Sequence, residues 1–139
     1  MLDTNMCIYV IREKPGRVLR RFRRTDVLAL CISSITLSEL EYGVSKSSRP
    51  AENKMALAAF LAPLQVFPYD DMAAQEYGRL RAALEKQGIP IGSLDMLIAA
   101  HALSLDRTLI TNNETEFSRI PQLRLQNWAT TSSSSREGS

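Results

Sequence analysis

Carboxylate and carboxamide side chains recur in four separate segments of this chain of 139 residues. The segments MLDTN, ITLSELEYG, PIGSLDMLIAAHAL and LITNNETEF supply Asp3, Glu39, Asp95, Asn113 and Glu116. Oxygen donors of this kind suit Mg²⁺ or Mn²⁺, which keep bound waters and bind through a few carboxylates. Such an ion lowers the pKa of a bound water and neutralises charge on a phosphate. The set therefore predicts a site for a divalent metal that could activate a water and neutralise charge on a phosphate.

Each of these side chains also fits a purely structural role. Asp3 fits the N-cap of a first helix, and Asn113 fits a turn. Thr36 and Glu39 have the spacing of a capping box, in which Glu39 bonds back to the start of its helix. Asp95 fits a first-turn acid that complements the helix dipole. The set as a whole, rather than any one position, favours the metal site.

Alternating strands and helices are the elements that would position these residues. Apolar patterning predicts strands at 1–3, 27–32, 65–69, 108–111 and 123–125, and helices at 5–13, 17–24, 36–44, 51–61, 71–88 and 94–105. This order predicts a three-layer α/β/α fold with a mainly parallel central sheet of about five strands. The continuous apolar run VLALCI at 27–32 is typical of a strand that is buried on both faces. Because ligands gather at the carboxyl ends of parallel strands, the polar residues that follow each strand are the site candidates.

Other site chemistries have little support in the sequence. The chain lacks a phosphate-binding glycine loop and a G-x-S-x-G nucleophile motif. The one histidine, His101, lies in an apolar helix and is predicted to be a hydrogen-bonded core residue. One histidine with Cys7 and Cys31 far apart in sequence argues against zinc. The acidic pair Asp70 and Asp71 follows a predicted strand and is interpreted as a helix N-cap.

Composition excludes wholesale disorder, since 45% of the residues are hydrophobic and 23% are charged. No apolar run reaches the roughly 18 residues that a membrane span needs, and no export signal is visible at MLDTN. These features predict a reduced, cytoplasmic protein without membrane association.

Basic residues gather in one segment although the net charge is only +2. Seven basic residues and one acid lie between Arg12 and Arg24. The pattern fits a contact surface for a polyanion such as RNA, and equally a solvated helix face. The candidates for RNA contact are Arg17, Arg20, Arg21 and Arg24.

The segments MLDTN, ISSITLSELEYG, PIGSLDMLIAAHAL and LITNNETEF, followed by LRLQNW, resemble the PIN-domain toxins of the VapC type in order and spacing. The resemblance covers residues 1–128. It implies an Mg²⁺-dependent endoribonuclease that is the toxin of a bacterial toxin–antitoxin pair. Asp3, Glu39 and Asp95 match the metal-binding acids of the family, and Asn113 matches a fourth position that is Asp in many relatives.

The resemblance also implies roles for the remaining polar residues. Glu116 matches a further acid near the metal, and the supporting polar positions correspond to Thr4, Asn5 and Thr111. On this reading Asp3 and Asp95 hold the ion, Glu39 binds it or positions the attacking water, and Asn113 orients a water.

Partners follow from the same resemblance. TNN, PIG and the final LRxxxW are similar to enterobacterial-type members, which cut initiator tRNA in the anticodon stem–loop. The family implies a homodimer and a complex with a cognate antitoxin that occupies the site. The helix within 51–64 is a candidate interface, although core packing is the preferred interpretation.

Two departures from the family pattern leave an alternative open. Only Met1 and Leu2 precede Asp3, so either the true start lies upstream of Met1 or the first strand is truncated, and a truncated strand is expected to place Asp3 poorly and to lower stability. Asn113 removes one negative charge. The alternative is a catalytically inactive RNA- or partner-binding protein on the same fold, and a third reading is a PIN nuclease of RNA maturation. We expect one nuclease domain at 1–128 and a disordered tail at 129–139.

Overall fold

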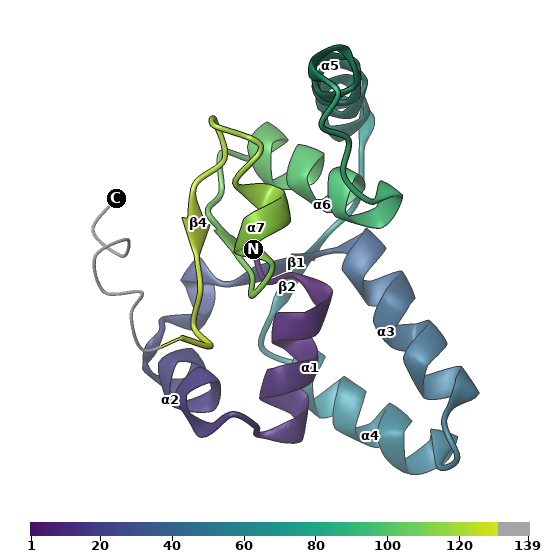
Figure 1. Cartoon of the computed structure of the whole chain (residues 1–139). Coiled ribbons are helices and arrows are strands. Elements are labelled where there is room, and N and C mark those ends of the chain that lie inside the picture. The colour runs from purple at the N-terminus through teal and green to yellow at the C-terminus, as the bar shows by residue number, and fades with distance from the viewer. Residues whose placement is uncertain (131–139) are drawn as a thin grey trace.

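The computed structural model describes residues 1–130. Its helices are α1 (Thr4–Arg12), α2 (Gly16–Arg24), α3 (Ser34–Lys46), α4 (Pro50–Leu61), α5 (Asp71–Gln87), α6 (Ser93–Ser104) and α7 (Glu114–Phe117), with a short 3₁₀ helix, η1 (Val27–Ala29). The strands are β1 (Cys31–Ser33), β2 (Gln65–Phe67), β3 (Leu109–Ile110) and β4 (Leu125–Gln126). The predicted alternation of strands and helices is therefore present (Figure 1).

Two small parallel sheets, β1 with β2 and β3 with β4, form the centre of the molecule. Residues 1–3 connect them, because the Leu2 N–H donates to the Cys31 carbonyl at 3.0 Å and the Ile110 N–H donates to the Met1 carbonyl at 2.8 Å. Leu2 forms only a single parallel bridge with Ile110. The parallel direction is as predicted, but a continuous five-stranded sheet is not confirmed, since residues 1–3 are too short a segment to form a ladder.

The core consists of two clusters on opposite faces of these strands. Successive residues of a strand point to opposite faces, so Leu2, Ile32 and Ile110 join one cluster and Met1, Cys31 and Leu109 join the other. The first cluster contains residues of α1–α4, and the second contains residues of α5–α7. Figure 1 shows α1–α4 below the strands and α5–α7 above them, which is a helix–sheet–helix arrangement.

The prediction of a buried strand over 27–32 is wrong in its first half. Residues 27–29 form η1, whose start is capped by the Asp26 side chain accepting from the Leu28 N–H at 3.0 Å. Val27 and Leu28 are 42% and 75% exposed, so the apolar run does not face two helix layers there. The strand begins only at Cys31 and is followed at once by α3.

Several local predictions are confirmed. Asp70 caps α5 by accepting from the Ala73 N–H, and Gly88 ends α5 in the left-handed conformation with φ of 72°. His101 is buried, and its Nδ1 lies 2.8 Å from the Ser33 hydroxyl. Both cysteines are buried and free.

The helix predicted within 51–64 is mostly exposed and packs on the core along one face. Leu57 and Phe60 of α4 are buried, and Phe60 stacks on Phe22 of α2 with ring centroids 5.9 Å apart. Met55, on the opposite side of α4, is 74% exposed. Within residues 1–130 no helix has the length and apolar character to cross a membrane. The tail prediction for 131–139 lies outside the described residues.

Candidate active site

Asp3 lies at the junction of the two sheets and the start of α1. It is buried, and its carboxylate caps α1 by accepting from the Met6 N–H at 2.9 Å. Its backbone N–H donates to the Ile110 carbonyl, and its carboxylate also accepts a hydrogen bond from the Thr111 side chain. Burial raises the pKa of Asp3, and these hydrogen bonds oppose that shift. The short first strand thus leaves Asp3 firmly held, contrary to the expectation that Asp3 would be poorly placed.

Glu39 lies in α3 and reaches toward the first turn of α1. The capping-box interpretation is wrong, because α3 begins at Ser34 and its N-cap is Ser33, which accepts from the Ile35 N–H. Glu39 is instead the sixth residue of α3. Its Oε1 accepts the Thr4 hydroxyl at 2.5 Å. The carboxylate is therefore oriented by a long-range contact between α1 and α3.

Asp95 occupies the first turn of α6, and Gly92 is the N-cap residue. A Cβ at Gly92 would lie 3.9 Å from the Asp95 Oδ2 and 3.5 Å from the Glu116 Oε1. The Gly92 backbone N–H also donates to the Glu116 carboxylate. These are ordinary contact distances, so the contribution of Gly92 to the site is its backbone N–H rather than its missing side chain.

Asn113 links the last two acids. Its Nδ2 lies 3.4 Å from the Asp95 Oδ2 and 3.0 Å from the Glu116 Oε2. Its backbone N–H donates to the Thr111 hydroxyl oxygen at 2.9 Å. The neutral carboxamide thus stands between two negative groups and donates to both.

Electrostatics shows that the acids converge. The pKa of Asp95 is raised from 3.8 to about 6, first by burial and then by the negative charges of Glu116, Asp3 and Glu39. The pKa of Glu116 is lowered, because the Gly92 N–H and the Asn113 carboxamide stabilise its charged form. The structure therefore brings together side chains from four predicted segments around Asp95.

The donors fit a hydrated divalent cation. Within residues 1–130, no three His, Cys, Asp or Glu side chains are arranged to hold a metal ion between them. Mg²⁺, however, retains several waters and binds directly through one or two carboxylates. Half-buried Asp95 is repelled by its acidic neighbours more than the Asn113 hydrogen bond offsets, and a cation would relieve that repulsion. The all-oxygen set fits Mg²⁺ or Mn²⁺ better than a thiophilic metal.

The predicted supporting residues lie in this site with different exposures. Thr111 is fully buried and bridges the Asp3 carboxylate and the Asn113 backbone. Thr4 holds Glu39. Asn5 is exposed and lines a groove beside the acids.

This groove has a volume of about 870 Å³ and is formed chiefly by α1, α3 and α4. Thr4, Asn5 and Glu39 lie in its wall. Apolar side chains form much of the remainder, among them Ile8, Ile11, Leu40, Leu57 and Leu94. Glu39 therefore adjoins a largely apolar surface.

The predicted RNA-contacting arginines lie on α2, at the end of α1 that is remote from Asp3 (Figure 1). Two of them contact the segment after β4: Arg17 donates to the Ala129 carbonyl at 2.6 Å, and the Arg21 guanidinium lies 5.6 Å from the Trp128 ring centroid. Arg20 and Arg24 are exposed. The prediction of a shared RNA-binding role for all four therefore overlooked a structural role for Arg17 and Arg21.

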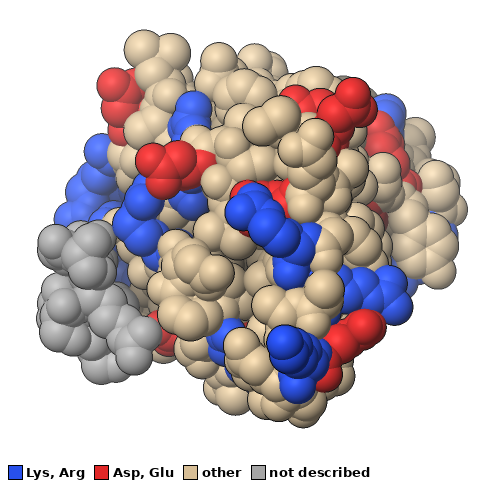
Figure 2. Space-filling model, turned by 90° about the horizontal axis from the view of Figure 1, so that it is seen from above, with Lys and Arg blue, Asp and Glu red and all other residues tan. Residues whose placement is uncertain are grey.

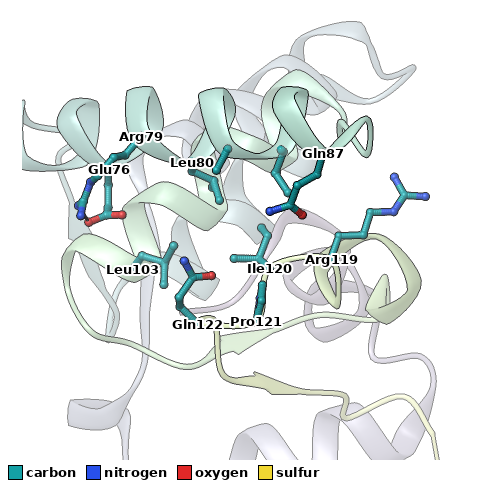
Figure 3. A pocket seen from close by; sticks show the side chains of 11 residues that line it. Glu76, Arg79, Leu80, Gln87, Leu103, Arg119, Ile120, Pro121 and Gln122 are labelled. Carbon is teal, nitrogen blue, oxygen red and sulfur yellow. Dashed lines mark hydrogen bonds and ion pairs between the residues drawn. The ribbon is translucent and has the colours of Figure 1, made fainter.

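The upper face of the molecule is of mixed charge. Figure 2 shows blue basic groups separated by red acidic groups on this face rather than one continuous basic surface. A second cavity, of about 260 Å³, lies between α5 and the turn after α7 (Figure 3). Its labelled residues include Leu80, Leu103 and Ile120, and none of the predicted site residues lines it.

Sequence reasoning missed two residues near the acids, Gly92 and Asn127. Asn127 follows β4, is buried, and donates from Nδ2 to Asn112 and Glu114. The rule that selected polar residues directly after strands also applies to Asn127, but the predicted last strand ended at residue 125, one residue before the end of β4. Gly92 carried no signal, because its role depends on a carboxylate 24 residues further along the chain.

Comparison with known proteins places this geometry in a family. A family model described as PIN domain matches residues 1–123. The chain is 44% identical to the tRNA(fMet)-specific endonuclease VapC of Salmonella typhimurium, over 92% of this chain and 96% of that protein. It is 43% identical to the protein of the same name from Shigella flexneri, over 93% and 97% of the two chains.

Solved structures agree. The DNA-bound VapBC structure from Salmonella typhimurium matches with a TM-score of 0.87 and 44% identity, over 92% of this chain and 96% of that one. VapBC2 from Rickettsia felis, bound to a DNA fragment from the promoter, matches with a TM-score of 0.84 and 42% identity, over 92% and 97%. This chain therefore belongs to the PIN-domain family and, within it, to the VapC proteins.

Proposed function

We propose that this chain is a cytoplasmic, metal-dependent endoribonuclease and the toxin of a toxin–antitoxin pair. The observation that carries the proposal is the convergence of Asp3, Glu39 and Glu116 on half-buried Asp95, whose pKa rises to about 6. Perturbed carboxyl groups gathered at the ends of parallel strands are typical of a site that does chemistry. The endonuclease and ribonuclease names of the relatives support the same activity.

Each site residue has a separate task in this proposal. Asp3 and Asp95 would hold Mg²⁺ or Mn²⁺. When bound there, the ion lowers the pKa of a water and neutralises charge on the phosphate. Glu39, held by Thr4, binds the ion or orients the attacking water. Asn113 donates from its carboxamide and orients a water, while Glu116 completes the acidic rim.

The proposed substrate is tRNA, and initiator tRNA in particular. Two relatives that are 43–44% identical over more than 90% of this chain are named tRNA(fMet)-specific endonucleases. Single-stranded loops are the usual target of sequence-selective RNA binding, because their bases can be unstacked. We therefore propose the anticodon stem–loop as the cleaved region.

Cleavage of purified tRNA tests the activity and the substrate together. Initiator tRNA and an elongator tRNA are incubated with the full chain in Mg²⁺ and in EDTA. We expect cuts in initiator tRNA in Mg²⁺ only, and no cuts with Asp95→Asn. Asp71→Asn, which changes an exposed acid in the first turn of α5, is the matched control and should cut normally. Cleavage that persists in EDTA or in Asp95→Asn would reject the proposed mechanism.

The groove beside Glu39 supports an antitoxin as partner. Its apolar wall along α1, α3 and α4 is suited to the apolar face of a helix. A basic side chain on that helix would reach Glu39 in the wall of the groove. We propose a homodimer of this chain that binds such an antitoxin, as in the toxin–antitoxin complexes among the structural neighbours.

A variant that fills the groove tests this partner. Ala56 of α4 is exposed and lines the groove, so Ala56→Arg should block the helix without disturbing the acids. We expect Ala56→Arg to cleave RNA normally but to lose co-purification with co-expressed cognate antitoxin. Retained co-purification would place the antitoxin elsewhere. Light scattering of the chain alone measures the proposed dimer.

A further inference from the structure

Asn127 is a buried carboxamide directly after β4, with 3% of its surface exposed. Its Nδ2 donates to the Asn112 Oδ1 at 3.2 Å and to the Glu114 Oε2 at 3.0 Å. Its Oδ1 accepts the Ala129 N–H at 2.8 Å. Burial of a carboxamide is costly unless it is hydrogen-bonded, and here both the amide nitrogen and the oxygen have partners. The side chain is therefore fixed in one orientation, because a flipped carboxamide would place its oxygen against the acceptor oxygens of Asn112 and Glu114.

The two residues that Asn127 holds are the immediate neighbours of Asn113 in the chain. Asn113 itself contacts the acids through its Nδ2, 3.0 Å from the Glu116 Oε2. We propose that Asn127 is a positioning residue for Asn113: it fixes residues 112 and 114 and thereby holds the Asn113 carboxamide against the acids. The consequence for catalysis rests on the proposed function, whereas the placement of Asn113 does not.

The segment that contains Asn127 is itself anchored to the helices. Arg17 of α2 donates to the Ala129 carbonyl at 2.6 Å. Asn112, in the loop between β3 and α7 that Asn127 contacts, has a separate link to the helices, because its side chain donates to the Tyr9 hydroxyl of α1 at 3.2 Å. Buried Trp128 packs in the cluster formed with α1–α4. Asn127 is therefore held in place by the rest of the structure, and its hydrogen bonds position the loop between β3 and α7.

Exact placement matters for a group that bridges two carboxylates. The Asn113 Nδ2 lies 3.4 Å from the Asp95 Oδ2, near the limit for a hydrogen bond, so a small movement of the loop breaks that contact. Misplacement of site groups by about 1 Å costs substantial activity. A residue that fixes both neighbours of Asn113 limits such movement.

The variant Asn127→Asp separates this role from packing, because it keeps the size of the side chain and the acceptor for the Ala129 N–H. It removes both donors and places a carboxylate beside Glu114. Adding Glu114→Gln restores one link with reversed polarity, since the new amide at position 114 donates to the new carboxylate at position 127. The double variant thus restores the hydrogen bond between positions 127 and 114 without restoring the asparagine.

The primary readout is the side-chain NH₂ signal of Asn113 in a ¹⁵N–¹H spectrum of the metal-free full chain. We expect this signal to shift in Asn127→Asp and to return toward its original position in the double variant. Glu114→Gln alone should leave it unchanged, because the glutamine oxygen still accepts from Asn127. Gln75→Glu, an amide-to-acid change at an exposed position of α5, is the matched control.

The secondary readout is steady-state cleavage of tRNA. We expect kcat to fall about 10- to 100-fold in Asn127→Asp, as for other residues that orient a site group, with KM unchanged. The double variant should recover part of kcat. A rise in KM with unchanged kcat would contradict a role in positioning Asn113.

A folded Asn127→Asp protein whose Asn113 signal does not move would overturn the proposal. If Asn127→Asp does not fold, Asn112→Ala and Glu114→Ala remove one of the two contacts each, at positions that are exposed and half-buried. An Asn113 signal that is unmoved in both would also overturn it. If the signal moves as expected but the wild-type chain cuts no RNA, the positioning role stands and the proposed function fails.

Discussion

The Thr4 hydroxyl donates to the Glu39 Oε1 at 2.5 Å and so connects the first turn of α1 to the middle of α3. Because α1 follows residues 1–3 and α3 follows β1, this contact between two separate segments orients Glu39 toward the other acids. Thr4→Val keeps the shape of the side chain and removes the donor. We expect kcat for tRNA cleavage to fall about 10-fold, with a loss of unfolding free energy of only about 1 kcal/mol. Thr4→Ser should cleave normally, and full activity in Thr4→Val would mean that Glu39 needs no such orientation.

Asp95 makes the metal-free protein less stable at neutral pH. Its pKa is raised from 3.8 to about 6 in the folded state, which therefore binds the proton more tightly than the unfolded chain does. The tighter proton binding of the folded state therefore stabilises the protein fully below about pH 4, and this stabilisation is lost as the pH rises through about 6. We expect Asp95→Asn to raise the free energy of unfolding at pH 8 by about 1 kcal/mol, allowing for solvent screening.

Urea unfolding in EDTA at pH 8 and at pH 4 measures this effect. The difference between Asp95→Asn and wild type should largely disappear at pH 4, where Asp95 is protonated in the folded state and partly protonated in the unfolded chain. A variant that is less stable than wild type at pH 8 would contradict the prediction.

Without metal we expect Asp95→Asn to be more stable than the wild-type chain, and a divalent cation should reverse this order. Binding only to the folded state stabilises a protein in proportion to the logarithm of ligand concentration over its Kd. We expect Mg²⁺ or Mn²⁺ to raise the melting temperature of the wild-type chain and to leave Asp95→Asn almost unchanged. Thermal unfolding over a Mg²⁺ titration, with Asp71→Asn as the control, measures the difference. An equal rise in all three proteins would indicate non-specific cation binding.

His101 is predicted to support the core and to take no part in cleavage. It is buried, and its Nδ1 lies 2.8 Å from the Ser33 hydroxyl. Its ring also meets Tyr69 edge-on at 5.4 Å. His101→Ala should lower the unfolding free energy by about 3 kcal/mol. At a temperature where the variant is folded, kcat should equal that of wild type, and a specific loss of kcat would give His101 a catalytic role.

The arginines of α2 should divide into two groups. Arg17→Ala is expected to lower stability by about 1 kcal/mol, because Arg17 donates to the Ala129 carbonyl. Exposed Arg20 and Arg24 are expected to contact RNA phosphates. Replacement of either by Ala should weaken RNA binding and reduce the slope of log K against log salt by about 0.7. Binding of the Asp95→Asn protein to tRNA over a salt series measures this, and an unchanged slope would remove α2 from the RNA contact.

Local features of the sequence determined the order of the elements and much of their ends. Asp70 and Gly88 bound α5 as predicted, because capping depends on residues within one turn. The apolar neighbours of His101 determined its burial in the same way. The placement of Asp3 and Glu116 after strands and of Asp95 at the start of an apolar helix was also a local property, and it selected these acids as candidates.

Only the tertiary structure decided how these residues face one another. Glu39 has capping-box spacing, yet α3 begins two residues earlier than predicted and leaves it free to meet Thr4. Arg17 fits a solvated basic face, yet it holds the segment after β4. The raised pKa of Asp95 and the hydrogen bonds from Asn127 to Asn112 and Glu114 arise from contacts between segments far apart in the chain. Such contacts carry no local pattern, because periodicity and caps reflect neighbours within a few residues, whereas a site is assembled by packing that brings distant strands and helices together.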